Sequence, residues 1–210
     1  MTNEIIVIFG RKGCGKTTLL KKIVSSNERV IFFDPTCQMT EGVLISDPQS
    51  LIGFLAINFH KKYRVIYQPD KGKPINSVLT EDKDETDYIE RHFGAVCQIV
   101  NCLYDVFFAV DEVDTVSDSS KCPDSFRSII ARGRHNKISL ITTTQRPPQT
   151  PRMLTSQADV FISFQQHEPN DIKYLQSFFG DKSQELKDLE KFEYIEYKDG
   201  KTSRKMLQMF

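Results

Sequence analysis

The chain has 210 residues and carries 28 Lys plus Arg against 28 Asp plus Glu, with a pI near 6.9. This balance excludes a general electrostatic attraction to nucleic acid, so any DNA contact has to come from a local basic patch or from several subunits together. The length predicts one domain, residues 1–210, with a substantial core. Because no apolar run could span a bilayer and the first residues lack a signal-peptide pattern, we expect no transmembrane segment.

Five cysteines are scattered along the chain and form no C-x-x-C pair. An odd, scattered set is typical of reduced thiols in a cytoplasmic compartment. His92, Cys97 and Cys102 are close in sequence, but no second pair of ligands is spaced to complete a tetrahedral site. We therefore interpret them as part of a helix and predict no structural metal there.

Apolar runs typical of strands alternate with segments that have helical spacing. The predicted strands cover residues 5–9, 29–33, 64–67, 106–110 and 138–145. The predicted helices cover residues 18–24, a segment that starts at 46–48 and reaches Phe59, residues 89–104 and residues 126–134. Residues 70–87 are expected to form an exposed loop that leads into a helix. This alternation predicts an α/β fold in which helices cover a mostly parallel sheet.

The end of the chain has a different pattern. Tyr194–Tyr197 and Lys205–Phe210 flank the dipeptide Asp199-Gly200. Such alternation around Asp-Gly predicts a β-hairpin within residues 191–210, appended to the core.

Residues 10–17 form a complete G-x-x-x-x-G-K-[ST] phosphate loop between a predicted strand and a predicted helix. Glycines allow a tight turn whose backbone N–H groups point at phosphate oxygens, with a helix N-terminus beneath them. Lys16 is expected to reach the β- and γ-phosphates of ATP, and the Thr17 hydroxyl to bind Mg²⁺. The predicted nucleotide-binding residues are Gly10, Arg11, Lys12, Gly13, Cys14, Gly15, Lys16, Thr17 and Thr18.

Two carboxylates, Asp111 and Glu112, follow the apolar strand 106–110 directly. Taken alone they could be two surface acids, but a phosphate loop on the same chain favours a catalytic role. Asp111 is predicted to hold Mg²⁺ through water, and Glu112 to act as general base toward the water that attacks the γ-phosphate. Because a nucleoside kinase has no need of the second acid, Glu112 favours a hydrolase.

A third group of candidates surrounds the strand 138–145, which ends in threonines and Gln145. Gln145 is placed to distinguish ATP from ADP or to orient the attacking water. Before this strand, Arg132 and Arg134 end a short predicted helix. Either could reach a neighbouring subunit's γ-phosphate as an arginine finger, whereas the alternative is that they only complement the helix dipole.

The order of these blocks resembles the FtsK–HerA superfamily of DNA-pumping ATPases over roughly residues 4–179. The segment from Ala131 through Gln145-Arg146-Pro147 resembles that family's sensor strand with its T-Q-R-P ending, and residues 157–164 resemble its next strand. The small size is similar to the genome-packaging ATPases of tailless icosahedral viruses with internal membranes.

The resemblance implies a RecA-like (ASCE) P-loop NTPase with the sensor strand between the phosphate-loop strand and the Walker B strand. It makes Lys16 and Thr17 the phosphate and magnesium residues, Asp111 and Glu112 the Walker B pair and Gln145 the sensor. It aligns Arg134 with the trans finger and leaves Arg132 as the nearby substitute. Lys137 departs from the family, which often has glycine just before the sensor strand.

The resemblance further implies a homo-oligomeric ring, hexameric or pentameric, that passes double-stranded DNA through its pore. Candidate pore loops are residues 114–124, with Lys121, and residues 146–152. A capsid or membrane-complex partner, and a location in the host cytoplasm or the virion, would fit such a motor.

Three functions therefore stay open. The first is a Mg²⁺-dependent ATPase that translocates DNA, with viral genome packaging as its role. The second is a plasmid, conjugation or secretion ATPase that acts with a membrane partner. The third is a slow, nucleotide-gated interaction module, which strong DNA stimulation of turnover would exclude.

Overall fold

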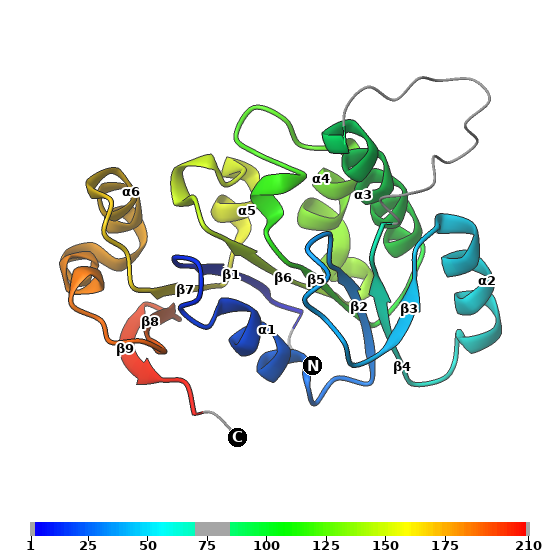
Figure 1. Ribbon diagram of the computed structural model, residues 1–210, viewed down its shortest axis with the longest axis horizontal. Helices are drawn as coiled ribbons and strands as arrows, with labels where there is room; N and C mark the ends of the chain where they lie inside the picture. The colour runs from blue at the N-terminus through cyan, green and yellow to red at the C-terminus, as the bar shows by residue number, and fades with distance from the viewer. Residues whose placement is uncertain (1–2, 70–84, 209–210) are drawn as a thin grey trace.

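The computed structural model describes residues 3–69 and 85–208 (Figure 1). Most of the loop expected over residues 70–87 lies outside the described residues. In the described part, no helix is both long enough and apolar enough to cross a membrane.

One sheet holds all nine strands of the described residues, in the order β3-β4-β2-β5-β6-β1-β7-β8-β9. The strands are β1 (Ile5–Phe9), β2 (Arg29–Phe33), β3 (Val43–Ile45), β4 (Tyr63–Tyr67), β5 (Val106–Val110), β6 (Ile138–Thr144), β7 (Val160–Phe164), β8 (Glu193–Lys198) and β9 (Lys201–Met206). All pairings from β3 through β7 are parallel, and β8 and β9 add an antiparallel hairpin to the edge. The predicted fold class is therefore confirmed, including the hairpin.

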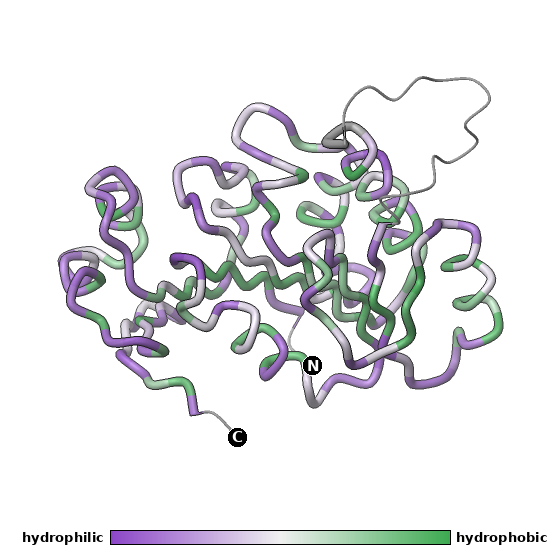
Figure 2. Tube along the Cα trace, in the orientation of Figure 1, coloured by the Kyte–Doolittle hydropathy of each residue, from purple (hydrophilic) through white to green (hydrophobic). Residues whose placement is uncertain are grey.

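Helices cover both faces of the sheet. The helices are α1 (Lys16–Val24), α2 (Pro48–Asn58), α3 (Glu85–Asn101), α4 (Asp124–Arg132), α5 (Arg152–Gln157) and α6 (Pro169–Phe179). Side chains of β1 alternate between the faces, because Ile5, Val7 and Phe9 pack with residues of α2 to α6, whereas Ile6 and Ile8 pack with α1. Figure 1 accordingly shows α1 on one side of the sheet and α3, α4 and α5 on the other, and Figure 2 shows the apolar strands between them.

Local capping explains where α2 begins. The Asp47 carboxylate accepts a hydrogen bond from Ser50 N–H at 2.8 Å, and Pro48 occupies the first turn. A proline there costs nothing, because the first N–H groups of a helix have no intrahelical partner. The helix start predicted at residues 46–48 agrees with this geometry.

The turn of the hairpin lies at the Asp-Gly pair that predicted it. Asp199 and Gly200 form the turn with φ angles of 51° and 75°, and Lys198 pairs directly with Lys201. Two left-handed residues are what a tight two-residue hairpin turn requires. The last strand therefore begins at Lys201 rather than at Lys205.

Candidate active site

The candidate site lies at the carboxyl ends of three neighbouring parallel strands. β6 lies between β1 and β5, with Phe9 paired to Thr144 and Val110 paired to Thr142. This is the strand order that the resemblance implied. Because carboxyl ends of parallel strands meet at one sheet edge, Gly10, Asp111 and Gln145 all follow strands that end there.

The phosphate loop keeps glycine where the backbone or the packing demands it. Gly10 has φ +154°, and a Cβ there would lie 2.7 Å from Cys14 Sγ and 2.8 Å from Phe164 Cβ. Gly15 precedes α1 with φ +113°, and a Cβ there would lie 2.9 Å from the Phe192 ring. The loop is therefore a tight turn held between β7 and the residues that precede β8.

Lys16 begins α1 and is only 6% exposed. Its Nζ donates a hydrogen bond to the Arg11 carbonyl at 3.0 Å, which folds the side chain back along the loop. The Arg11 guanidinium in turn donates to Gln165 Oε1 at 3.3 Å. These contacts place the lysine ammonium over the loop whose N–H groups would receive phosphate.

Thr17 and Asp111 form an oxygen-rich pair beside the loop. Thr17 Oγ1 lies 3.3 Å from Asp111 Oδ1 and 3.2 Å from Oδ2. The Thr143 hydroxyl donates to Asp111 Oδ1 at 2.6 Å, and the carboxylate is almost fully buried. Burial raises the pKa of Asp111, an effect that the hydrogen bonds from Thr143 and Thr17 only partly oppose. A divalent cation would stabilise the ionised carboxylate, and these oxygens are the ligand type that Mg²⁺ prefers.

Glu112 and Gln145 are brought into direct contact. Gln145 Nε2 donates a hydrogen bond to Glu112 Oε1 at 2.5 Å. Glu112 has a left-handed backbone with φ 53° and ψ 59°, and its N–H donates to Thr143 Oγ1 at 2.8 Å. Residues of the sensor strand and its end therefore contact both members of the pair: Thr143 bonds to the Asp111 carboxylate and to the Glu112 main-chain N–H, and Gln145 bonds to the Glu112 carboxylate.

Asp114 is a further carboxylate at the site that the sequence analysis did not single out. Its Oδ1 is buried and has no hydrogen-bond partner among the described residues. Burial raises its pKa, while the Thr144 hydroxyl and the charge of Lys16 act in the opposite direction. Its position two residues after Glu112 was the available signal in the sequence.

The two candidate finger residues lie at the opposite edge of the sheet. Arg132 ends α4, and Arg134 lies in the turn η2 (Gly133–Asn136), which leads into the amino end of β6. The seven residues of β6 separate this edge from the phosphate loop by about 20 Å, so neither arginine reaches the loop of its own chain. Arg134 is bound to the Asp159 carboxylate at 2.7 and 2.8 Å. Arg132 is exposed and has no side-chain hydrogen bond or ion pair within the described ranges.

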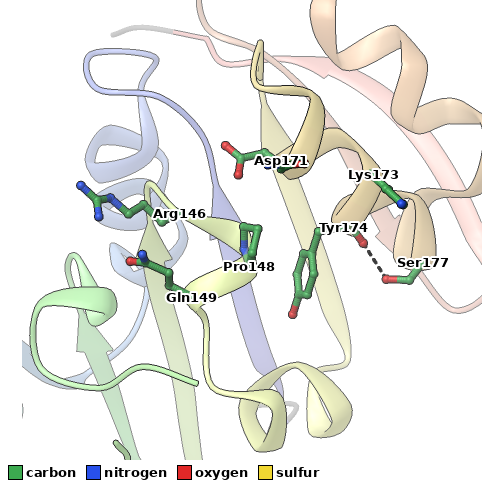
Figure 3. Close-up of a pocket in the computed structure, with 8 residues that line it drawn as sticks. Arg146, Pro148, Gln149, Asp171, Lys173, Tyr174 and Ser177 are labelled. Atoms are coloured by element: carbon green, nitrogen blue, oxygen red, sulfur yellow. Dashed lines mark hydrogen bonds between the residues drawn. The ribbon is translucent and has the colours of Figure 1, made fainter. Parts of the chain in front are cut away.

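The two candidate pore loops differ in their surroundings. Lys121, in the first loop, forms an ion pair with Glu90 of α3. The second loop contains the turn η3 (Pro147–Gln149), and it faces α6 across a pocket of about 670 Å³. Figure 3 shows Pro148 and Tyr174 beside this pocket, with Arg146 and Lys173 on its opposite sides.

Fold and site together define a RecA-like P-loop nucleoside triphosphatase. A family model described as an AAA domain matches residues 1–147, and the chain belongs to this family of P-loop ATPases. The chain has no match among curated protein sequences.

Solved structures share the fold over almost the whole chain. The genome packaging NTPase B204 from Sulfolobus turreted icosahedral virus 2, solved with AMPPCP, has a TM-score of 0.73 and 19% identity, covering 98% of this chain and 99% of that one. VirB4 of Thermoanaerobacter pseudethanolicus has a TM-score of 0.67 and 12% identity, covering 98% and 89%. The pCW3 conjugation coupling protein TcpA has a TM-score of 0.51 and 14% identity, covering 96% and 59%. The resemblance to FtsK–HerA ATPases is thereby confirmed at the level of the fold.

Proposed function

We propose that this ATPase hydrolyses ATP with Mg²⁺, assembles as a ring and translocates double-stranded DNA, with viral genome packaging as its role. The observation that best supports ATP hydrolysis is a set of contacts beside the phosphate loop, made by Thr17, Asp111, Glu112 and Gln145. Similarity to the packaging NTPase over nearly all of both chains supports the motor role.

In this proposal each residue has one task. Lys16 and the loop N–H groups bind the β- and γ-phosphates, and Thr17 and Asp111 hold Mg²⁺, which neutralises charge that develops on the phosphates. Glu112 accepts a proton from the attacking water, and Gln145 positions Glu112 through their hydrogen bond. A guanidinium from the next subunit completes the site in this proposal, because the two candidate fingers, Arg132 and Arg134, lie at the far edge of the sheet in their own chain.

A conjugation or secretion ATPase is the second candidate. Its support is the likeness of the fold to VirB4 and TcpA. A protein-directed secretion ATPase differs from the first candidate in its expected response to duplex DNA, since it would turn over without DNA stimulation.

Steady-state ATP turnover at low salt, with and without duplex DNA, tests the proposal. We expect turnover to rise several-fold with DNA and to fall by about 10²–10⁴-fold in Glu112→Gln, which loses the general base. The variant should still bind ATP, because its Thr17 and Asp111 are unchanged. Brisk turnover that ignores DNA would favour a protein-directed secretion ATPase, and binding without turnover would favour an interaction module or a motor that needs its capsid.

A further inference from the structure

The loop after β2 brings a third oxygen to the Thr17–Asp111 pair. Gln38 Oε1 lies 3.5 Å from Thr17 Oγ1, the hydroxyl that is also 3.2 Å from Asp111 Oδ2. The main-chain carbonyl of Gln38 accepts a hydrogen bond from Lys21 Nζ of α1 at 3.0 Å. The amide oxygen thus lies beside the first turn of α1, next to the Thr17 hydroxyl that also contacts Asp111.

A buried carboxylate fixes this loop. Asp34 follows β2 and is fully buried. Its Oδ1 accepts hydrogen bonds from Gln38 N–H at 3.2 Å and from the Thr36 hydroxyl at 3.1 Å. Its Oδ2 accepts from Met39 N–H at 2.7 Å and from Gln68 Nε2 at 2.8 Å.

Four donors on one carboxylate leave the loop little freedom. A carboxylate is tolerated in a protein interior when its oxygens are hydrogen-bonded in this way, and such bonds are stronger than those between neutral groups. Because two of the donors are main-chain N–H groups of the loop itself, Asp34 determines the path of the backbone at Gln38. The side chain of Gln38 is exposed, so packing does not explain its position.

We propose that Gln38 is a positioning residue for the magnesium ion, that it accepts a hydrogen bond from a metal-bound water through its amide oxygen, and that Asp34 fixes it there. This inference rests on the proposed function. Mg²⁺ takes few protein ligands directly and keeps several of its waters, so a neutral oxygen just outside the coordination sphere suits it. Groups that hold such waters affect metal affinity without touching the metal.

Magnesium affinity, measured without catalysis, tests the proposal. Mg²⁺ is titrated into protein saturated with a fluorescent ADP analogue, and binding of the analogue is also measured in EDTA. We expect Gln38→Ala to weaken Mg²⁺ binding by about 10-fold and to leave ADP affinity in EDTA unchanged. Gln38→Glu keeps an acceptor oxygen and should retain the wild-type affinity or exceed it. Gln176→Ala, at an exposed position on α6, is the matched control.

The possible results distinguish a failure of the proposed role of Gln38 from a failure of the proposed ATPase function. Wild-type Mg²⁺ affinity in Gln38→Ala would overturn the role of Gln38 while leaving the ATPase proposal intact. Failure of the wild-type protein to bind the ADP analogue at all would overturn both. Asp34→Asn, which replaces one acceptor oxygen by a donor, should weaken Mg²⁺ binding as Gln38→Ala does. If Asp34→Asn instead binds Mg²⁺ normally while keeping its fold, Asp34 does not fix the glutamine.

Discussion

Arg132 and Arg134 are two residues apart but have different surroundings. Arg134 is committed to Asp159, whose other contact is with the N–H of Ile5 at the start of β1. Arg132 is exposed and has no partner in the described part of its own chain. We therefore favour Arg132 as the residue that reaches a neighbouring subunit, which reverses the preference for Arg134 that the family resemblance implied.

Arg132→Ala should then lower ATP turnover on the order of 10³-fold, because a finger stabilises charge in the transition state, and should leave the melting temperature unchanged. Arg134→Ala should instead lower the melting temperature by a few degrees, since it removes a partly exposed ion pair worth at most about 1 kcal/mol. Turnover assays and thermal melts of both variants check this. If only Arg134→Ala loses turnover, Arg134 is the arginine finger and Arg132 is not.

Individual site residues could be predicted from the sequence when they directly follow a recognisable strand. Asp111 and Glu112 follow a strand of five buried apolar residues, and the same logic applied to residues 29–33 would have identified Asp34. Gln38 could not be predicted, because its closeness to Thr17 depends on the path of an irregular loop.

At the scale of elements, the C-terminal hairpin supports the phosphate loop. Leu207 is nearly buried, and a Cβ on Gly15 would lie 3.2 Å from its Cδ2. Leu207 N–H also donates to the Phe192 carbonyl at 2.9 Å, which closes the hairpin under the loop. The hairpin is thus packed against the nucleotide site even though it contributes no group to the proposed chemistry.

Leu207→Ala should destabilise the protein by about 2–5 kcal/mol and weaken ADP binding, because the cavity it leaves loosens the turn at Gly15. Thermal melts and ADP titrations test both effects. Met206→Ala, at a side chain that is half exposed, is the control and should change neither. Lower stability with undiminished ADP affinity would mean that the hairpin stabilises the fold without shaping the site.

Elements were predictable where the apolar pattern is long. β3 was missed because it has three residues, two of them exposed, and exists only through pairing with β4. α6 was missed although the signal was present: Pro169 in the first turn, and Ile172, Leu175 and Phe179 at helical spacing.

At the scale of the whole molecule, buried His92 makes stability depend on pH. Its Nδ1 lies 2.5 Å from the Tyr67 hydroxyl, and its Nε2 is buried without a hydrogen-bond partner in the described residues. Burial lowers the pKa of His92, with a smaller contribution from the charge of Arg91, while Asp47 opposes the shift. Burial also raises the pKa of Tyr67, so the hydroxyl stays protonated, and it shares a hydrogen bond with Nδ1 of the neutral imidazole.

Because the folded state binds the His92 proton less tightly than the unfolded state, the free energy of unfolding should fall as pH drops below about 6.5 and be insensitive to this group above it. Urea unfolding between pH 5 and 8 measures the slope, which for one proton is at most about 1.4 kcal/mol per pH unit. His92→Gln keeps an acceptor for Tyr67 and should flatten the profile. The exposed variant His135→Gln is the control, and an identical slope in both would exclude His92 as the cause.

The position of β1 affects how the protein is made. This first strand pairs with residues near 140 on one side and near 160 on the other, so its neighbours are synthesised long after it. At ribosomal rates of about 5–20 residues per second, the strand that carries the phosphate loop waits roughly ten to thirty seconds for them. The phosphate loop is therefore translated well before the two strands that flank β1 in the sheet. Until β6 and β7 have been made, the strand that carries the phosphate loop has neither of its neighbours in the sheet.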